Sequence, residues 1–371
     1  MKNQKLKLIS EGKTEIYSYA SKQNKKGPLS KEKEPFYNSS MELNRDVSIA
    51  FVQWFTNNYK KKLQLLDGLS ASGIRGIRFA KEVEGNFNVT LNDINEKSYS
   101  LMLKNMEQNK IKNIIAKNKN LNVLLSEENF DYIDIDPFGS PIYFFDSAIR
   151  SIKKNGIIAI TATDVATLCG VHPKVCLRRY GAKSYHSDMM REIGLRILIG
   201  SMCKTAAMYD KGINPILSYY HDHYYRTYIQ IKKGKTNANN SINNFKMIGS
   251  NEIDLTSTTN DKIGPLWMGK LQDLKVIREI RTFMDHKKFN TKKEIYKLLR
   301  YLEEEADSPP FFYNTDFLAS FYKVSVPKVN DVILNLKKKG YVATITHFGF
   351  SSFKTNAPFE EIKQVFKDHY T

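Results

Sequence analysis

The chain has 371 residues and a net charge of +18, because 57 Lys and Arg residues outnumber 39 Asp and Glu residues. This length exceeds one compact core of ordinary size, so we expect two domains, and the surplus of cations favours a polyanionic partner, chiefly nucleic acid. No apolar run is long enough to span a membrane and the N-terminus lacks the apolar core of a signal peptide, so we expect a soluble, cytoplasmic protein without membrane contact. We also expect a monomer.

After a polar lead-in over residues 1–40, which we expect to be irregular or a hairpin, strands and helices alternate. The predicted helices cover residues 41–59, 74–82, 96–110 and 144–156, and the predicted strands cover residues 63–66, 88–93, 130–139 and 156–164. This alternation is typical of an α/β fold whose parallel sheet is covered on both faces.

Acidic residues stand at or near the carboxyl ends of these four strands, namely Asp67, Asp93, Asp136 and Asp164. Ligands of open α/β sheets bind beyond the carboxyl ends of the strands. We therefore expect the four carboxylates to share one rim of the sheet.

Further along, residues 191–207 form a predicted amphipathic helix and residues 215–233 supply strands that close the sheet. The Asn-, Ser- and Thr-rich segment 233–262 is interpreted as an excursion or linker, with a short hairpin near residues 245–248.

A second unit is predicted at the C-terminal end. Thr291-x-x-Glu294 has the form of a capping box that opens a helix, and further helices near residues 317–322 and 329–336 precede a hairpin over 341–356. The order helix, helix–turn–helix, hairpin is typical of a winged helix, which binds nucleic acid about as often as it merely packs. We therefore divide the chain into a Rossmann-like domain, residues 1–262, and a smaller winged-helix-like α+β domain, residues 263–371.

The turn from Asp67 to Gly73 reads DGLSASG and joins a strand to a helix. Small residues such as Ser70 and Gly73 allow backbone amides to approach a ligand at the helix N-terminus. The dinucleotide pattern G-x-G-x-x-G and the phosphate loop are both absent, and an acid before small residues suits a ligand with a positive amine. The pattern predicts S-adenosylmethionine, with Asp93 accepting hydrogen bonds from the ribose; a turn without any ligand is the alternative.

Asp136-Pro137-Phe138 resembles the D/N-P-P-Y/F element of amino-group methyltransferases. An exocyclic amine is a poor nucleophile because its lone pair is delocalised into the base. Asp136 can accept an N–H hydrogen bond and the departing proton, Pro137 fixes the turn, and Phe138 offers a face on which a base can stack. The alternative is an acidic helix N-cap after a strand.

Basic and aromatic residues gather at Arg178, Arg179, Tyr180 and Lys183, a combination that suits contact with phosphates and bases. A solvated basic face is the alternative. The three cysteines, Cys169, Cys176 and Cys203, include no C-x-x-C pair, which fits a reducing compartment and predicts no metal site.

Several stretches together resemble the tRNA guanine-26 N2-dimethyltransferase family from about residue 8 to the C-terminus. They are FYNSSMELNRD (36–46), DGLSASGIRGIRFAKE (67–82), IDIDPFGSP (133–141), VCLRRYGAKSYHSDMMREIGLRILIG (175–200), DHYYRTYIQIK (222–232), GPLWMGKL (264–271) and THFGFSSFKTNAP. The resemblance implies transfer of one or two methyl groups from S-adenosylmethionine to guanine N2 in tRNA, and a C-terminal domain that binds tRNA.

Residue by residue, the resemblance implies that Arg45 and Arg75 lie at the methionine end of the cofactor. Asp93 corresponds to the ribose ligand, and Asn120-Leu121 stands where the family usually has an Asp-Ala pair beside adenine. Loss of that carboxylate predicts weaker cofactor binding. Phe36 matches an aromatic residue expected to help Phe138 sandwich the guanine.

The chain departs from the family in one further feature. Many members carry two C-x-x-C pairs before GPLW, whereas this chain has no cysteine after Cys203. We therefore expect no zinc hairpin. Two other functions stay open, an adenine-N6 methyltransferase acting on DNA or rRNA and a non-catalytic winged-helix RNA-binding protein.

Overall fold

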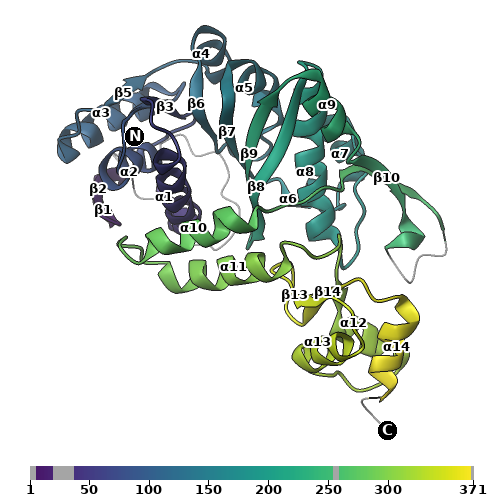
Figure 1. Ribbon diagram of the computed structural model, residues 1–371. Coiled ribbons are helices and arrows are strands. Elements are labelled where there is room, and N and C mark those ends of the chain that lie inside the picture. Colours follow the sequence, from purple (N-terminus) through teal and green to yellow (C-terminus); the bar gives the residue numbers. More distant parts are fainter. Residues whose placement is uncertain (1–5, 20–36, 254–258, 369–371) are drawn as a thin grey trace, which may run out of the picture.

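The computed structural model describes residues 6–19, 37–253 and 259–368, and its centre is a seven-stranded sheet (Figure 1). In spatial order the strands are β5 (Ile114–Lys117), β4 (Phe87–Asn92), β3 (Leu63–Asp67), β6 (Phe130–Ile135), β7 (Ile152–Ala162), β9 (Tyr224–Lys233) and β8 (Lys211–His221). The first five strands are parallel, and the antiparallel hairpin β8–β9 closes the edge beside β7. The predicted Rossmann-like α/β sheet is confirmed, with a mixed edge.

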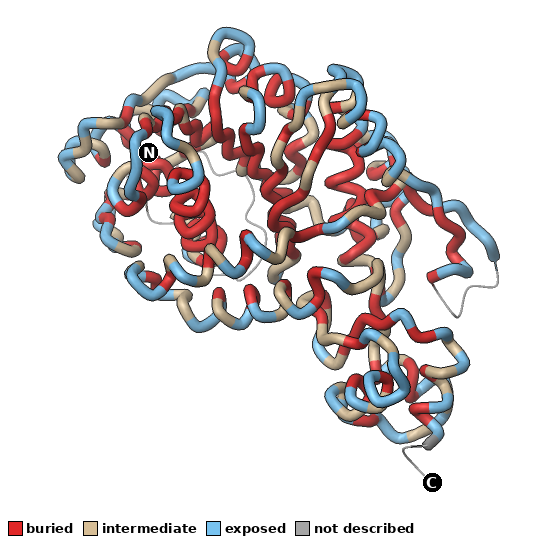
Figure 2. Tube along the Cα trace, in the orientation of Figure 1, coloured by how far each residue is buried: buried red, intermediate tan, exposed pale blue. Residues whose placement is uncertain are grey.

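Helices cover both faces of this sheet, as the apolar runs in its strands require. On one face lie α1 (Glu42–Asn57), α2 (Ile74–Glu82), α3 (Glu96–Asn109), α10 (Leu274–Met284) and α11 (Lys292–Glu305). On the other lie α4 (Leu121–Glu127), α5 (Phe145–Ser151), α6 (Val165–Leu168), α7 (Pro173–Tyr180) and α8 (Met190–Ala207). Figure 2 shows the central strands and most of α1 and α8 as buried.

The N-terminal lead-in contains the hairpin of β1 (Leu6–Glu11) and β2 (Thr14–Tyr19). It packs on α3 through a pair of hydrogen bonds, because the Tyr17 backbone donates to Asn105 and the Asn105 amide donates back to the Tyr17 carbonyl. A hairpin was one of the two forms expected here, and the hairpin places Glu11 beside α1.

Two predictions about the elements along the chain were wrong, one about where a helix ends and one about a segment expected to be a linker. The helix predicted over 144–156 ends at Ser151, because Ile152 is buried and pairs with Phe130, so that residues 152–156 already belong to β7. The described part of the segment 233–262 is more ordered than a linker. Helix α9 (Lys235–Ile242) packs on β8, where the Ser241 hydroxyl accepts from the Ile213 backbone at 2.9 Å. Strand β10 (Phe245–Gly249) pairs with β11 (Lys262–Trp267) rather than forming a local hairpin.

The C-terminal unit has the predicted helix–turn–helix and hairpin, followed by one further helix, whereas the first helix of the predicted winged helix is α11 in the core of the large sheet. The unit consists of α12 (Thr315–Tyr322), α13 (Val329–Lys338), α14 (Phe359–Asp368) and a sheet of β12 (Tyr313–Asn314), β14 (Ser352–Thr355) and β13 (Ala343–Ile345). Leu318, Leu336, Phe353 and Phe366 form its own small core. In Figure 1 this unit, drawn in yellow and yellow-green, lies below the large sheet.

Helices α10 and α11 share the core of the large sheet rather than that of the C-terminal unit. The Trp54 indole donates to Glu279 at 2.7 Å, and the Thr291 hydroxyl donates to Asp46 at 2.6 Å. The Thr291 side chain therefore does not cap its own helix as predicted. These contacts favour a domain boundary near residue 310, while the division at 262/263 stays a prediction. Within the described ranges, no helix is both long and apolar enough to cross a membrane.

Candidate active site

A cavity of about 470 Å³ opens where the parallel strands end, a volume in the range of small-molecule sites. Its walls come from the loops after β3, β4 and β6 and from the N-terminal end of α1. Eight predicted site residues line it: Arg45, Asp67, Ser70, Arg75, Asp93, Asp136, Pro137 and Phe138. The topology thus brings together residues that lie up to 93 positions apart in the sequence.

The turn after β3 is shaped by small residues. Gly73 has φ of 82°, a left-handed conformation in which a larger residue is strained, and it precedes the first residue of α2. At Gly76, a Cβ atom would lie 2.1 Å from Leu91 in β4, so α2 can pack closely on the sheet. This packing holds the N-terminal end of α2 against the cavity.

Asp67 ends β3 with its carboxylate almost completely buried. It accepts a hydrogen bond from the Gly76 backbone at 3.1 Å. Burial raises the pKa of Asp67 to about 7, because desolvation and the nearby Asp134 outweigh the attraction of Arg75. A cationic amine in the cavity would favour the ionised form of this carboxyl.

Asp93 follows β4 and faces the same cavity. One carboxylate oxygen accepts from the Ala71 backbone and the other from the Asn95 backbone, both at 2.9 Å. Burial raises the pKa of Asp93 despite these hydrogen bonds. The two backbone donors fix the carboxylate in position while it stays within reach of a ligand's hydroxyl groups.

Asp136, Pro137 and Phe138 form the loop directly after β6. Alternation along β6 puts residues 132, 134 and 136 on the α1 side, where Arg75 contacts Oδ2 of Asp136. Among the described residues, Oδ1 of Asp136 has no hydrogen-bond partner. Phe138 remains 51% exposed, and the backbone of Gly139 donates to the Thr163 hydroxyl at 2.8 Å. The loop therefore presents a carboxylate and an aromatic ring to the cavity.

Behind Asp136 lies a chain of buried charges that the sequence did not single out. Arg226 of β9 donates to both oxygens of Asp134, at 2.9 and 2.6 Å, and Arg75 lies 3.6 Å from Asp134. Arg75 also donates to Asn44 and Ser48 of α1. Although burial raises it, the pKa of Asp134 is lowered overall because both guanidinium groups favour its ionised form.

A second buried network joins the N-terminal hairpin to the cavity wall. Arg45 donates to both oxygens of Glu11, at 2.7 and 2.6 Å, and Arg78 contacts Glu11 at 2.7 Å. The two cations overcome the effect of burial and lower the pKa of Glu11 to about 2. Tyr37 donates to the same carboxylate and lies 4.8 Å from the Arg45 guanidinium. The predicted ligand Arg45 is thus held by residues that the sequence analysis missed.

Other predicted residues lie away from the cavity. Asn120 caps α4 by accepting from the Asn122 backbone, and Leu121 is buried beneath Gly68. Neither lines the cavity among the described residues, so their adenine-side role stays a prediction. Phe36 lies outside the described residues. Asp164 was expected on the rim, but it accepts from Tyr180 at 2.8 Å, and Thr163 lines the cavity in its place.

The structure separates the residues predicted to contact RNA into a buried tyrosine and three cations nearer the surface. Tyr180 is 3% exposed, and its hydroxyl bonds to Ser140 and Asp164, so its ring has a structural place. Arg178 is exposed, Arg179 lies 3.5 Å from Asp164, and Lys183 lies 3.3 Å from Asp261. The signal that could have separated them is helical spacing, because Cys176 and Tyr180 lie four residues apart on the buried side of α7.

The cavity suits a nucleoside that carries an amine better than a dinucleotide. Carboxylates stand at Asp67 and Asp93, apolar side chains such as Leu69 and Ile94 form walls between them, and the turn offers no phosphate loop. This donor set fits S-adenosylmethionine. An open α/β sheet with these acids and an Asp-Pro-Phe loop at its carboxyl edge defines a Rossmann-like methyltransferase.

Comparison with known proteins specifies the family. The profile of the N2,N2-dimethylguanosine tRNA methyltransferases matches residues 12–367, and the chain belongs to this family. It is 38% identical to the tRNA (guanine(26)-N(2))-dimethyltransferase of Pyrococcus furiosus, covering 97% of this chain and 98% of that protein. The enzyme of the same name from Methanobrevibacter smithii is 35% identical, covering 99% and 98%.

A solved structure is similar throughout. Trm1 from Pyrococcus horikoshii, determined in complex with S-adenosyl-L-methionine, superimposes with a TM-score of 0.86 at 36% identity and covers 97% of this chain and 99% of its own. The similarity includes the C-terminal unit as well as the large sheet.

Proposed function

We propose that this protein transfers methyl groups from S-adenosylmethionine to the exocyclic N2 of guanine 26 in tRNA, and that it does so twice on the same nitrogen. Family membership and the similarity to relatives of that activity support the reaction class. The single structural observation that carries the proposal is the carboxylate of Asp136, which lines the cavity beside Phe138 and shares that cavity with Asp93.

The chemistry requires a group that accepts a proton from an amine of low nucleophilicity. Oδ1 of Asp136 can accept an N–H hydrogen bond from N2, which localises the nitrogen lone pair, and the carboxylate takes the proton as the N–C bond forms. When bound, S-adenosylmethionine supplies the methyl group from its sulfonium. Arg75 holds Oδ2, so that the carboxylate keeps one orientation while Oδ1 faces the substrate.

The target base must leave its stack to reach Asp136. Phe138 is exposed at the mouth of the cavity and offers a face for an extruded purine, a contact that compensates in part for the lost stacking. The second transfer needs the monomethylated amine to return with its remaining proton toward Asp136. Displacement of this kind requires no covalent attachment to the base, which agrees with Cys169, Cys176 and Cys203 being buried and taking no part in it.

The side chains that line the cavity supply the proposed contacts with the cofactor. Asp93 would accept from the ribose hydroxyls, and Arg45 and Arg75 would face the carboxylate end of the methionine. Within the described residues no cluster of three or more His, Cys, Asp or Glu side chains could hold a metal ion. The proposed transfer uses side chains of this chain and the cofactor.

The test is incubation of the purified protein with unmodified tRNA and isotopically labelled S-adenosylmethionine, followed by nucleoside analysis. We expect mono- and dimethylguanosine, lost when guanine 26 is replaced by adenine. Label in N6-methyladenosine would instead support an adenine methyltransferase. No label with any tRNA, together with no heat of cofactor binding in calorimetry, would leave a non-catalytic RNA-binding protein.

A further inference from the structure

A second cavity, of about 430 Å³, lies between the large sheet and the C-terminal unit. Its walls are the β8–β9 turn, one face of α11 and the segment 345–352 that joins β13 to β14. None of the predicted site residues lines it. The space is therefore distinct from the active-site cavity.

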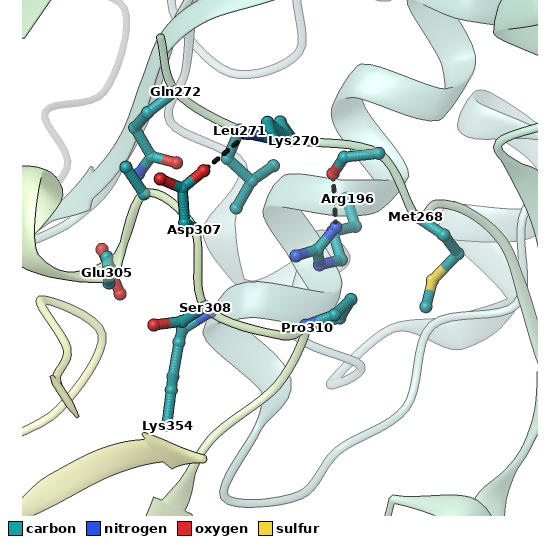
Figure 3. Close-up of a pocket in the computed structure, with 12 residues that line it drawn as sticks. Arg196, Met268, Lys270, Leu271, Gln272, Glu305, Asp307, Ser308, Pro310 and Lys354 are labelled. Atoms are coloured by element: carbon teal, nitrogen blue, oxygen red, sulfur yellow. Dashed lines mark hydrogen bonds and ion pairs between the residues drawn. The ribbon is translucent and has the colours of Figure 1, made fainter. Parts of the chain in front are cut away.

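Buried charges join the C-terminal unit to the large sheet beside this second cavity. Lys354 of β14 donates to both oxygens of Glu192 in α8, at 2.9 and 2.8 Å, and Arg196 binds the same carboxylate. Figure 3 shows Lys354, Arg196 and Glu305 around a small neighbouring cavity of about 110 Å³. Breaking such a buried pair is costly, so the C-terminal unit is held rigidly.

A second connection lies at the wall itself. His347 contacts Glu305 at the end of α11 through Nδ1, and the Tyr220 backbone donates to His347 Nε2 at 3.2 Å. These two contacts require a neutral imidazole with its proton on Nδ1. The segment 345–352 is thus bound to both α11 and the β8–β9 hairpin.

The exposed side of this cavity combines aromatic rings with cations. Phe350 is 89% exposed, and Lys297 lies 5.9 Å from the centres of both the Phe350 and the Tyr301 rings. Arg300 lies 5.2 Å from the Tyr301 ring. Aromatic rings beside cations are the combination that binds single-stranded nucleic acid, because bases stack on the rings and phosphates pair with the cations.

The lining also contains the acids Asp222 and Glu294. Asp222 lies 3.5 Å from the His221 imidazole, which places its charge at the hairpin rather than at Phe350. Glu294 lies three residues before Lys297 on α11, and Arg191 adds a second cation to the lining. The two cations and the Phe350 ring define the part of the cavity that is complementary to an anionic ligand with a flat ring.

The active-site cavity lies on the other side of the same hairpin. His221 and Asp222 line the second cavity, whereas His223, the next residue along the turn, lines the active-site cavity. The β8–β9 turn therefore lies between the two cavities and contributes to the walls of both.

We propose that the second cavity is a binding site for an unpaired nucleotide of the substrate RNA, with its base stacked on Phe350 and its phosphate near Lys297. This inference rests on the proposed function and extends it to a second nucleotide. The occupant is RNA because stacking and a cation are supplied together, next to the cavity that receives the target base.

The direct test is Phe350→Trp, which keeps a ring and adds a fluorophore. The two natural tryptophans, Trp54 and Trp267, are buried, so the new indole dominates the solvent-sensitive signal. We expect quenching when unmodified tRNA saturates the protein and no change with S-adenosylmethionine alone. Phe350→Ala should weaken tRNA binding about 5- to 150-fold, the range of one base–aromatic stack, and leave cofactor affinity unchanged.

Leu103→Ala is the matched control, because Leu103 is an exposed apolar residue on α3 and should leave tRNA affinity unchanged. Unchanged fluorescence of Phe350→Trp at saturating tRNA, or equal affinity of Phe350→Ala and the unsubstituted protein, would overturn the subsite. Normal methylation in the same samples would show that the proposed function survives. Absence of tRNA binding by the unsubstituted protein would overturn both proposals.

Discussion

The two cavities on either side of the β8–β9 turn are similar in volume, about 470 and 430 Å³, but they hold their charges differently. In the active-site cavity the charges are buried and joined in series, from Arg226 through Asp134 and Arg75 to Asp136. In the second cavity the cation Lys297 is exposed and lies beside aromatic rings.

This difference suits two tasks. Buried, mutually oriented charges do not need to reorganise when a reaction begins, so they favour chemistry at a fixed atom. Exposed cations keep their solvation and mobility, so they add affinity for a polyanion without fixing one geometry. Substitutions in the two cavities should therefore change different observables.

The largest effect is expected at the carboxylate itself. Asp136→Asn keeps the shape of the side chain but cannot accept the proton from N2, so turnover should fall about 100- to 10,000-fold. Affinities for tRNA and for S-adenosylmethionine should change little, which filter binding and calorimetry would measure. Asp146→Asn, at an exposed position on α5, is the control and should retain full turnover. Full turnover by Asp136→Asn would contradict the role of this residue.

Arg226→Met tests whether the buried charges beside the active-site cavity stabilise the fold. It leaves the buried Asp134 carboxylate without its bidentate partner, so the free energy of unfolding should fall by about 3–5 kcal/mol, as measured by denaturant titration. Arg226→Lys should be intermediate, because an ammonium group cannot make both hydrogen bonds in the same geometry. Arg150→Met, which removes an exposed pair with Asp146, should change stability by no more than about 0.5 kcal/mol.

Asp67, in the wall of the active-site cavity, should make the free energy of unfolding depend on pH. Because burial raises its pKa to about 7, the native state keeps a proton on Asp67 between about pH 4 and pH 7 that the unfolded chain has released. The free energy of unfolding should fall as pH rises through this window, by up to about 4 kcal/mol for this group. Denaturant titrations at pH 5 and pH 8 should show a smaller loss for Asp67→Asn than for the unsubstituted protein. Equal losses would show that Asp67 does not hold the proton.

The smallest effect is expected at Lys297. Lys297→Gln should weaken tRNA binding several-fold and reduce the slope of log affinity against log salt by about one, the signature of one lost phosphate contact. Stability should stay within about 0.5 kcal/mol. Lys275 is an exposed lysine on a different helix, α10, so Lys275→Gln provides the comparison and should keep the original slope. An unchanged slope for Lys297→Gln would place the RNA backbone elsewhere.

Local features of the active site could be predicted from the sequence because each lies where a strand ends. Asp67, Asp93 and Asp136 follow apolar runs, and a parallel sheet brings the ends of its strands to one edge. The same reasoning failed at Asp164, where α7 folds back and Tyr180 binds the carboxylate. No local pattern reports such a contact between residues 16 positions apart.

Partners from distant segments were missed for a related reason. Arg226 reaches Asp134 across 92 positions, and Arg45 reaches Glu11 across 34. Nothing in the residues next to either arginine indicates which acid it will meet. Likewise, the polar sequence of residues 233–262 predicts an excursion or linker, although Ala238 and Ser241 of α9 are buried.

The sequence by itself determined the alternation of strands and helices, the acids at their ends and the Asp-Pro-Phe loop, because apolar periodicity and turn residues act over a few neighbours. The tertiary structure decided which charges become buried partners and how the C-terminal unit lies beside the β8–β9 turn. Those outcomes depend on packing between segments far apart in the chain, because a buried charge is tolerated only where packing brings groups of opposite charge to it.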